Sequence, residues 1–578
     1  MAPAPFDPVH LDLQVAAGTG AGAQEDGIQM QIRDVPTRSF RSIFKWGAPD
    51  VFYDVDDRLR GFIRDTLQLP EERFSELFHP GLEQVPDLPA PDLPEDTLAR
   101  LEAMVGAENV ATDGYTRAEH CCGSAYLDLL RLRLGKVEGA PDAVVYPRTE
   151  DEVSAVVALC HDRTIALVPT GARSSVTRGL ELPRGGISLD LSRHLNRVLE
   201  LNETSHTARV QPGMGGPAYE QWLNARGYTC GHFPQSFEFS SVGGWVAARG
   251  AGQQSTHYGK IEDMVLGLRC ATPRGMLATA PFPRAALGPD FTQMVVGSEG
   301  TLGVITEATL KVWPHRPKSV LPMTFMFRSF EDGVTTIRTL LQAGIGRPGV
   351  CRLSDPEETQ AALTLDGFAG GSVDRTLQRI GYRPGSRSLM IAATEGDLAM
   401  ATATAARAHA IAIKQGGLPL GPKPLRAWWK RRFHDPYLRD DLMDYGVMTD
   451  TLETAMTWSD LPQVWRGVRE VIKSRPNTAC LTHISHAYET GANLYFIVIS
   501  AMDREHPTRD YREFHGRIVD AVVQHGGSLS HHHGVGRLFA PWYPQQVGEV
   551  AFEAYRGLKS ALDPHGIMNP GAYGLGTG

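Results

Sequence analysis

The stretch Ile165-Ala166-Leu167-Val168-Pro169-Thr170-Gly171-Ala172-Arg173-Ser174-Ser175-Val176 runs from an apolar segment directly into a turn of small residues. A short apolar segment bounded by a glycine turn predicts a buried strand. Small residues after a strand let backbone N–H groups approach an anionic ligand closely. The turn matches neither the Gly-x-Gly-x-x-Gly fingerprint nor the P-loop. By itself it indicates either a cradle for a phosphate or pyrophosphate or an ordinary tight turn.

Two further loops of small residues lie downstream. They are Pro234-Gln235-Ser236-Phe237-Glu238-Phe239-Ser240-Ser241-Val242-Gly243-Gly244-Trp245 and Gly297-Ser298-Glu299-Gly300-Thr301-Leu302-Gly303-Val304-Ile305-Thr306. Both can pass along a flat, extended cofactor, because small side chains leave the backbone accessible. Further strands are expected at 142–147, 186–191 and 207–212, with a helix at 149–161. Three such loops on one α/β domain favour a cofactor site over three unrelated turns.

The patterns along the chain predict four regions. Residues 1–140 form an N-terminal helical extension with linkers, rich in Gly and Ala before residue 35 and in Pro at 80–94. Residues 141–316 form the cofactor domain. Residues 317–520 form a mixed α/β domain, with strand-then-helix pairs at 323–337 and 389–409 and a strong strand at 494–502. Residues 521–578 form a C-terminal segment.

Composition excludes several classes of protein. The 578 residues carry a formal net charge of -9, so a nucleic acid is not an expected partner. The seven cysteines are scattered and form no Cys-x-x-Cys pair, which indicates a reducing compartment and no structural zinc or disulfide framework. We find neither a secretory signal nor an apolar run long enough to span a membrane.

The segment Gly526-Gly527-Ser528-Leu529-Ser530-His531-His532-His533-Gly534-Val535-Gly536 sets three imidazoles between glycines. In an extended segment successive side chains alternate, so His531 and His533 would share one face and His532 the other. Imidazole titrates near neutrality and can accept a proton from a hydroxyl group. The alternatives are an adventitious metal-binding tract and histidines that are hydrogen-bonded in the core. No metal is expected, because the Cys or carboxylate neighbours of a dedicated site are not evident.

With Lys45-Trp46-Gly47 and Tyr488-Glu489-Thr490-Gly491-Ala492-Asn493-Leu494-Tyr495-Phe496, these motifs make the chain resemble the vanillyl-alcohol oxidase-type FAD-binding family. Within it the resemblance is to the alkyldihydroxyacetonephosphate synthases. It implies an α+β fold with a two-part FAD-binding domain, a mixed α/β cap domain and an N-terminal helical extension. It also implies exchange of the acyl chain of 1-acyl-dihydroxyacetone phosphate for a fatty alcohol, which forms an ether lipid without net redox.

The resemblance assigns roles to particular residues. Tyr495 would move a proton at substrate C1, and His531, His532 and His533 would take the alcohol proton. Arg439 would bind the substrate phosphate with its planar fork, and Arg352 would act near the flavin. The structural alternatives are an aromatic side chain in a β pattern for Tyr495, a surface ion pair with Asp440 or Asp441 for Arg439, and a structural arginine at position 352.

The resemblance also predicts the FAD contacts. They are Pro169, Thr170, Gly171, Ala172, Arg173, Ser174, Ser175, Val176, Gln235, Ser236, Glu238, Ser240, Ser241, Ala248, Arg249, Gly250, Ala251, Glu299, Gly300, Thr301, Leu302, Gly303, Val304 and Ile305. Relatives that bind the flavin covalently carry a histidine in the first loop. Residues 171–174 contain none, so we expect non-covalent FAD. Arg173 would either pair with the pyrophosphate or point outward, and the Asn569-Pro570-Gly571 ending would return to the flavin domain.

Two other functions fit the same scaffold: an FAD-linked oxidase or dehydrogenase of a 2-hydroxy acid or alcohol, and a flavin protein without activity. The expected partners are acyl-dihydroxyacetone phosphate and a fatty alcohol, and the expected assembly is a homodimer. The basic, aromatic segment 423–433 is either a solvated helix face with buried tryptophans or an interfacial segment. The chain ends Gly-Thr-Gly rather than Ser-Lys-Leu, so we expect a cytoplasmic protein, peripheral at the inner membrane surface.

Overall fold

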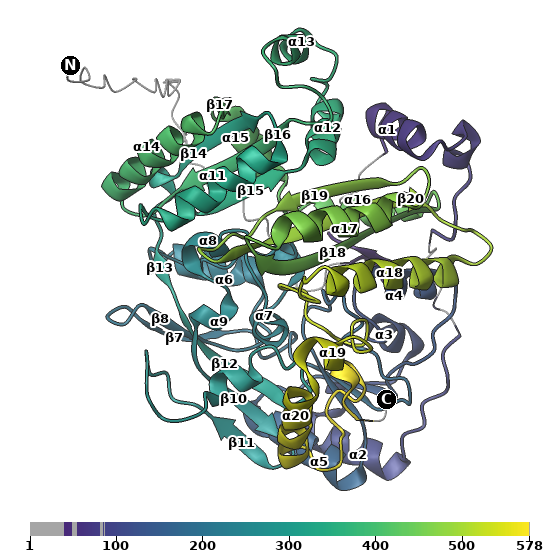
Figure 1. The fold of residues 1–578 in the computed structure, drawn as a ribbon. Helices are drawn as coiled ribbons and strands as arrows, with labels where there is room; N and C mark the ends of the chain where they lie inside the picture. The colour runs from purple at the N-terminus through teal and green to yellow at the C-terminus, as the bar shows by residue number, and fades with distance from the viewer. Residues whose placement is uncertain (1–39, 49–54, 81–84, 86, 577–578) are drawn as a thin grey trace, which may run out of the picture.

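The computed structural model describes residues 40–48, 55–80, 85 and 87–576. Three β-sheets dominate the described chain, two before residue 312 and one after residue 320. Figure 1 shows the largest sheet with its helices above the two smaller sheets, while the C-terminal helices return to the lower part. The arrangement is α+β, as predicted.

The first small sheet holds the strand that opened the sequence analysis. Its order is β3 (Val110–Ala111), β4 (Ala143–Val145), β6 (Ile187–Asp190) and β5 (Leu167–Thr170), and the last three strands are parallel. Helices α2 (Glu95–Val105) and α5 (Glu150–Arg163) pack against it through an aliphatic core. Thr149 caps α5 by accepting from the Glu152 N–H. Strand β5 is largely buried. The first glycine loop, which follows its carboxyl end, therefore begins in the interior of the molecule.

The second small sheet is antiparallel and carries the other loops. Its order is β11 (Gly275–Ala278), β10 (Val265–Thr272), β12 (Val304–Lys311), β8 (Thr207–Val210) and β7 (Val198–Asn202). Its helices are α6 (Gly216–Asn224), α7 (Val242–Ala248), α8 (Ser255–Tyr258), α9 (Ile261–Met264) and α10 (Phe291–Val295). The second loop leads into α7 and the third into β12, so both open toward the end of β5.

The cap sheet is antiparallel throughout its seven strands. Their order is β17 (Leu418–Pro419), β14 (Leu321–Phe327), β16 (Ser388–Thr394), β15 (Val350–Ser354), β19 (Ala479–Ile484), β20 (Gly491–Ala501) and β18 (Val447–Thr457). Helices α11 (Phe330–Gln342), α14 (Leu398–Lys414), α17 (Leu461–Lys473) and α18 (Pro507–Gln524) bury one face. The predicted strand-then-helix pairs correspond to β14–α11 and β16–α14, and the predicted strand at 494–502 to β20. Helices α12 (Pro356–Leu365), α13 (Ser372–Arg379), α15 (Lys423–Arg431) and α16 (Asp435–Met443) complete the cap.

Side-chain alternation along the cap strands separates core from cavity. On β20, Leu494 and Phe496 point into the helix-covered core, while Tyr495 and Ile497 line a cavity on the opposite face. On β18, the side chain of Thr451 lines the same cavity. The open face of the cap sheet is thereby directed at the glycine loops.

The N-terminal region contains short strands as well as the predicted helices. Besides α1 (Asp57–Leu67), α3 (Gly114–Glu119) and α4 (Tyr126–Arg133), it contains the hairpin β1 (Phe40–Ser42) and β2 (Lys45–Trp46). It also supplies β3 to the first sheet. These short strands exist because tertiary partners satisfy their backbone: β3 pairs with β4, and the Trp46 N–H donates to Asp440 at 2.9 Å. The linker expected before residue 35 lies outside the described residues.

The C-terminal segment returns to the flavin domain, as predicted. After α19 (Tyr543–Val547) and α20 (Glu549–Leu562), Met568 forms a parallel bridge with Leu167 of β5. Asn569 Nδ2 donates to the carbonyls of Gly179 and Glu299 at 3.0 and 2.6 Å. Among the residues that the structure describes, no helix is both long and apolar enough to cross a membrane.

Candidate active site

A cavity of about 310 Å³ lies between the glycine loops and the open face of the cap sheet. The first, second and third loops all contribute to its wall. The predicted cofactor contacts that line it are Pro169, Thr170, Gly171, Ala172, Arg173, Ser174, Ser175, Val176, Gln235, Ser236, Ser240, Ser241, Ala248, Gly250, Ala251, Glu299, Gly300, Gly303 and Ile305. Three segments far apart in sequence therefore form one continuous surface.

The loops approach one another so closely that side chains are excluded at several points. A Cβ at Gly171 would lie 2.3 Å from the Ser241 Oγ, and one at Gly300 would lie 2.8 Å from the Pro169 ring. Gly300 also has a φ of 78°, which favours glycine. A narrow wall of backbone and small side chains fits a flat, extended group with a pyrophosphate. These residues fit FAD.

Five predicted cofactor residues lie outside the cavity lining: Glu238, Arg249, Thr301, Leu302 and Val304. Leu302 and Val304 are fully buried in the domain interior. The Thr301 hydroxyl is engaged with that of Tyr555 at 2.8 Å.

Glu238 and Arg249 are directed away by other partners. Glu238 accepts from the Tyr437 hydroxyl at 3.3 Å. Arg249 is a left-handed residue with a φ of 54° that ends α7, and its guanidinium reaches Gln293 at 3.0 Å near the surface. Both side chains thus serve the packing around the loops.

Arg173 does not point outward, and its predicted pairing with the pyrophosphate stays a prediction. Its φ of 58° places a non-glycine residue in the left-handed region. Its side chain is buried, and NH2 contacts the Glu119 carboxylate at 2.9 Å. The guanidinium therefore neither points outward nor depends on a pyrophosphate for a counter-ion, although the residue lines the cavity.

Tyr495 projects from β20 into the cavity beside His483 of β19. The register pairs the two residues directly, and their rings stack with centroids 4.9 Å apart. The Tyr495 hydroxyl lies 3.5 Å from Gln235 Oε1 of the second loop. Burial raises the pKa of this phenol, so Tyr495 is neutral near pH 7. It is placed to donate or accept a proton between cap and flavin loops.

Arg352 lies behind His483 rather than on the cavity wall. Its NH2 contacts Glu358 Oε1 at 2.5 Å and its NH1 lies 3.1 Å from His483 Nε2. Glu358 also contacts His483 Nδ1 at 3.0 Å. Burial alone would raise the pKa of Glu358, but the adjacent imidazole and guanidinium hold it at about 2. The predicted contact between Arg352 and the cavity is therefore indirect, through the orientation of His483.

Arg439 lines the cavity from α16. Its Nε donates to Asp440 Oδ1 at 2.8 Å, and NH1 donates to the Ser124 carbonyl at 2.8 Å. These bonds leave NH2 for a ligand in the cavity. The arginine does form the ion pair named as its structural alternative, but the pair is internal: the side chains of Arg439 and Asp440 are 12% and 0% exposed.

The histidine triplet lies in a bend rather than a strand, so the predicted alternation of its side chains is wrong. His532 and His533 line the cavity together, and His531 lies behind them. The physical reason is Glu453 of β18, whose buried carboxylate accepts from the backbone N–H groups of His531, His532 and His533 at 2.6, 3.0 and 2.9 Å. Three successive N–H groups converge on one carboxylate, which an extended strand does not permit.

Burial and neighbouring charges set the protonation of this group. Burial alone would raise the pKa of Glu453, but the imidazoles hold it well below its usual range. Burial lowers the pKa of His533 to about 4. His533 is therefore a neutral imidazole near pH 7 and can accept a proton.

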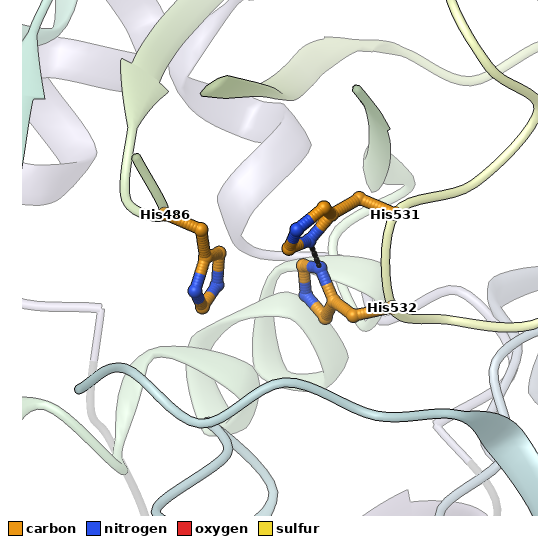
Figure 2. A group of neighbouring side chains, drawn as sticks. All are labelled: His486, His531 and His532. Carbon is orange, nitrogen blue, oxygen red and sulfur yellow. Dashed lines mark hydrogen bonds between the residues drawn. The ribbon is translucent and has the colours of Figure 1, made fainter. Parts of the chain in front are cut away.

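His531 belongs to a second cluster with His486. Figure 2 shows His486, His531 and His532 grouped around a common centre, with His531 and His532 bonded through their Nδ1 atoms at 3.0 Å. The ligand atoms of these three residues, and those of Glu453, His532 and His533, lie within 4.8 Å of one another in each group. Either group could hold a metal ion.

Glu299 of the third loop fixes the other end of the histidine segment. Its Oε2 accepts from the N–H groups of Val535 and Gly536 at 3.0 and 2.8 Å. A Cβ at Gly534 would lie 2.4 Å from Glu299 Oε1, which explains the glycine there. Glu453 of the cap thus binds the first part of the histidine segment, and Glu299 of the flavin domain binds its last part.

The sequence analysis missed several cavity residues: His232, Asp435, Thr449, Thr451 and His483. Among the described residues, the Thr449 hydroxyl and both ring nitrogens of His232 lack hydrogen-bond partners, which suits residues that meet a ligand. No local signal marked them, since a Thr or His within a strand is unremarkable. The pairing of His483 with Tyr495 across two strands is a property of the sheet register.

Two family models match the chain. Residues 141–280 match an FAD binding domain, and residues 316–573 match the C-terminal domain of FAD linked oxidases. The first match covers the first two loops, and the second covers the cap sheet, Tyr495 and the histidine segment. FAD is the cofactor of this chain.

Three known proteins extend the comparison. The chain is 32% identical over 536 residues to alkyldihydroxyacetonephosphate synthase from Dictyostelium discoideum, covering 89% of this chain and 87% of that one. A solved structure of alkyldihydroxyacetonephosphate synthase is 31% identical and superposes with a TM-score of 0.76 over 91% of this chain and 94% of that one. P-cresol methylhydroxylase, at 17% identity and a TM-score of 0.66 over 84% of this chain and 98% of that one, shares the fold. With its flavin loops, Tyr495 and histidine segment around one cavity, the chain belongs to the alkyldihydroxyacetonephosphate synthase family of FAD-linked enzymes.

Proposed function

We propose that this protein is an FAD-dependent alkyldihydroxyacetonephosphate synthase, which replaces the acyl chain of 1-acyl-dihydroxyacetone phosphate with a fatty alcohol. One observation carries the proposal: a guanidinium, a phenol and two imidazoles line the same cavity as the three flavin loops. Each group matches one need of the reaction, namely phosphate binding, proton transfer at C1 and acceptance of the alcohol proton.

Arg439 would bind the phosphate. Its pairing with Asp440 and Ser124 fixes the guanidinium plane, so that NH2 can donate to a phosphate oxygen. The Thr449 hydroxyl, which has no hydrogen-bond partner among the described residues, is a second donor on the same wall. The phosphate then anchors the remainder of the substrate toward Tyr495.

Tyr495 and the imidazoles would move protons. FAD, when bound, supplies an electrophilic ring that can accept and return an electron pair without net oxidation of the substrate. Tyr495, neutral and within 3.5 Å of Gln235 in the second loop, would exchange a proton with substrate C1. His532 or His533 would accept the hydroxyl proton of the fatty alcohol.

The test is ether formation by the purified, FAD-loaded protein. Palmitoyl-dihydroxyacetone phosphate and labelled hexadecanol are supplied without oxygen or any electron acceptor. Label in an alkali-stable alkyl product, with one fatty acid released per ether, is the expected result. Intact yellow flavin without product, together with flavin reduction by a 2-hydroxy acid, would establish the oxidase or dehydrogenase function instead. Intact flavin that reacts with neither substrate type would indicate an inactive flavin protein.

We also propose a cytoplasmic homodimer that contacts the inner membrane surface peripherally. Support comes from the seven buried, unpaired cysteines, which suit a reducing compartment, and from the exposed basic side chains of Lys423, Arg426, Lys430 and Arg431 around α15. Trp428 and Trp429 are half-buried against the cap, so the charges rather than the indoles would meet anionic lipid. Light scattering tests the dimer, and co-sedimentation with anionic vesicles tests the membrane contact; unchanged binding after reversal of these four charges would contradict it.

A further inference from the structure

A continuous chain of hydrogen bonds leads away from the cavity through the histidine cluster. His532, on the cavity wall, contacts His531 through the two Nδ1 atoms at 3.0 Å. The other nitrogen of His531, Nε2, contacts the Tyr488 hydroxyl at 2.9 Å. Tyr488 is half-buried and precedes the exposed Glu489 and Thr490. Its hydroxyl also lies 3.4 Å from the Ser255 Oγ. The chain of bonds thus leads from the cavity wall to a residue that is partly exposed.

The proposed reaction requires such a connection. The alcohol loses its hydroxyl proton when its oxygen bonds to carbon, and the released fatty acid is a carboxylate near neutral pH. Each turnover therefore releases one proton, and the cavity is largely enclosed by the flavin loops and the cap sheet. The following inference rests on the proposed function.

We propose that His532, His531 and Tyr488 form a proton relay that carries the alcohol proton from the cavity to solvent. The imidazole of His532 takes the proton at Nε2 and passes its Nδ1 proton to Nδ1 of His531. His531 passes its Nε2 proton to the Tyr488 oxygen, and Tyr488 releases its own hydroxyl proton outward. Every group ends neutral, and one proton leaves the protein.

The groups around these three side chains favour the transfer of a proton over its retention. Burial, with the charge of Lys260, keeps the pKa of His531 well below its usual range. Lys260 donates to the His531 carbonyl at 2.6 Å. The Glu453 carboxylate lies 3.4 Å from His532 Nδ1 and can stabilise a transient positive charge on that ring. A proton would therefore pass through His531 without staying.

The same imidazoles also have the spacing of a candidate metal site, but two observations favour the relay. Tetrahedral zinc with bonds of about 2.0 to 2.1 Å holds its nitrogen ligands roughly 3.3 Å apart, whereas the two Nδ1 atoms are 3.0 Å apart, a hydrogen-bond distance. The ammonium of Lys260 also donates to the backbone carbonyl of His531, and a cation beside this residue disfavours a second one. A bound metal is kept as an outcome of the test.

Tyr488→Phe tests the relay, since it removes one hydroxyl and little else. We expect kcat for ether formation to fall by about tenfold to a hundredfold, with the KM of both substrates unchanged. In a single turnover followed with a pH-indicator dye, proton release should keep pace with ether formation in the wild type and lag behind it in the variant. Tyr382→Phe is the matched control, because its hydroxyl bonds only the Gly416 carbonyl, at 2.9 Å, in the outer cap.

A second measurement needs no variant. The wild-type rate in mixtures of H2O and D2O should depend on the deuterium fraction along a curve, as several protons move together; a straight line would contradict the relay. An unchanged kcat and no lag in Tyr488→Phe would overturn it while leaving the synthase function standing. Stoichiometric metal whose removal by a chelator abolishes ether formation would also overturn it. No ether from the wild type would overturn both proposals.

Discussion

Arg439 NH1 donates to the backbone carbonyl of Ser124 at 2.8 Å, across 315 positions of sequence. Ser124 in turn donates its hydroxyl to the Arg173 carbonyl at 3.1 Å and its N–H to the Ser175 carbonyl at 2.7 Å. One residue of the N-terminal region therefore contacts both the first flavin loop and the proposed phosphate ligand. Ser124 thereby helps to fix the separation between the cofactor and the substrate phosphate.

Arg439→Ala should raise the KM for palmitoyl-dihydroxyacetone phosphate by about ten- to a hundredfold, because a hydrogen bond to a charged group contributes about 1.5 to 3 kcal/mol. Steady-state kinetics with a saturating alcohol measures it. The control is Arg556→Ala, which removes an exposed arginine paired with Glu553 at 2.7 Å. An unchanged KM in Arg439→Ala would remove this residue from phosphate binding.

Tyr495→Phe should lower kcat by about a hundredfold or more, since a positioned acid or base contributes two to four orders of magnitude. FAD content and the KM values should stay near those of the wild type, because the ring and its stacking on His483 remain. Full activity in the variant would show that C1 chemistry does not use this phenol.

Glu453→Gln should lower the free energy of unfolding by about 3 kcal/mol. The amide NH2 of Gln would face N–H donors that the carboxylate now accepts, leaving buried groups unsatisfied. Urea unfolding measures this, with Glu489→Gln as the exposed control. A loss equal to that of the control would mean that the histidine segment holds its shape without this carboxylate.

Stability should fall with acidification below pH 6.5, in part through His533. The unfolded chain binds a proton at an ordinary imidazole pKa of about 6.5, whereas the folded protein binds it at about 4. Between these values the unfolded state holds more protons, so the free energy of unfolding falls with pH by up to about 1.4 kcal/mol per unit. His533→Asn should flatten this slope; an equal slope in both proteins would be the contrary result.

FAD should leave the protein on acid precipitation, and the supernatant should carry all of the flavin absorbance. The first loop contains no histidine to be alkylated, and its Arg173 is occupied by Glu119. Four other imidazoles line the cavity, those of His232, His483, His532 and His533. Flavin that stays with the pellet would place a covalent bond on one of them, which peptide mass spectrometry would locate.

Patterns within short windows predicted much of the fold. The apolar run into residues 169–176, the two later loops and the strand at 494–502 all appear where expected. They could be predicted because backbone geometry and alternation act over a few residues. The short strand β3 could not, because its pairing partner β4 lies more than 30 positions further along the chain.

Some residues of the candidate active site could also be predicted from the sequence, and others could not. Its residue types at 439, 495 and 531–533 were identified from the sequence, while His232, His483 and Thr449 were not. The orientation of the triplet was predicted wrongly because a strand was assumed, and the residue that bends it, Glu453, is 78 positions away from His531. Arg352 was expected at the cavity but lies one contact behind it, through His483.

The sequence by itself determined the cofactor loops, the strand periods and the family of this protein, because these depend on residue type and local spacing. The tertiary structure alone decided which imidazoles face the cavity, which carboxylates hold the histidine segment and how the cap register sets Tyr495 beside His483. The reason is physical: a buried carboxylate or a paired strand satisfies backbone groups through space, and sequence proximity carries no information about which distant group will do so.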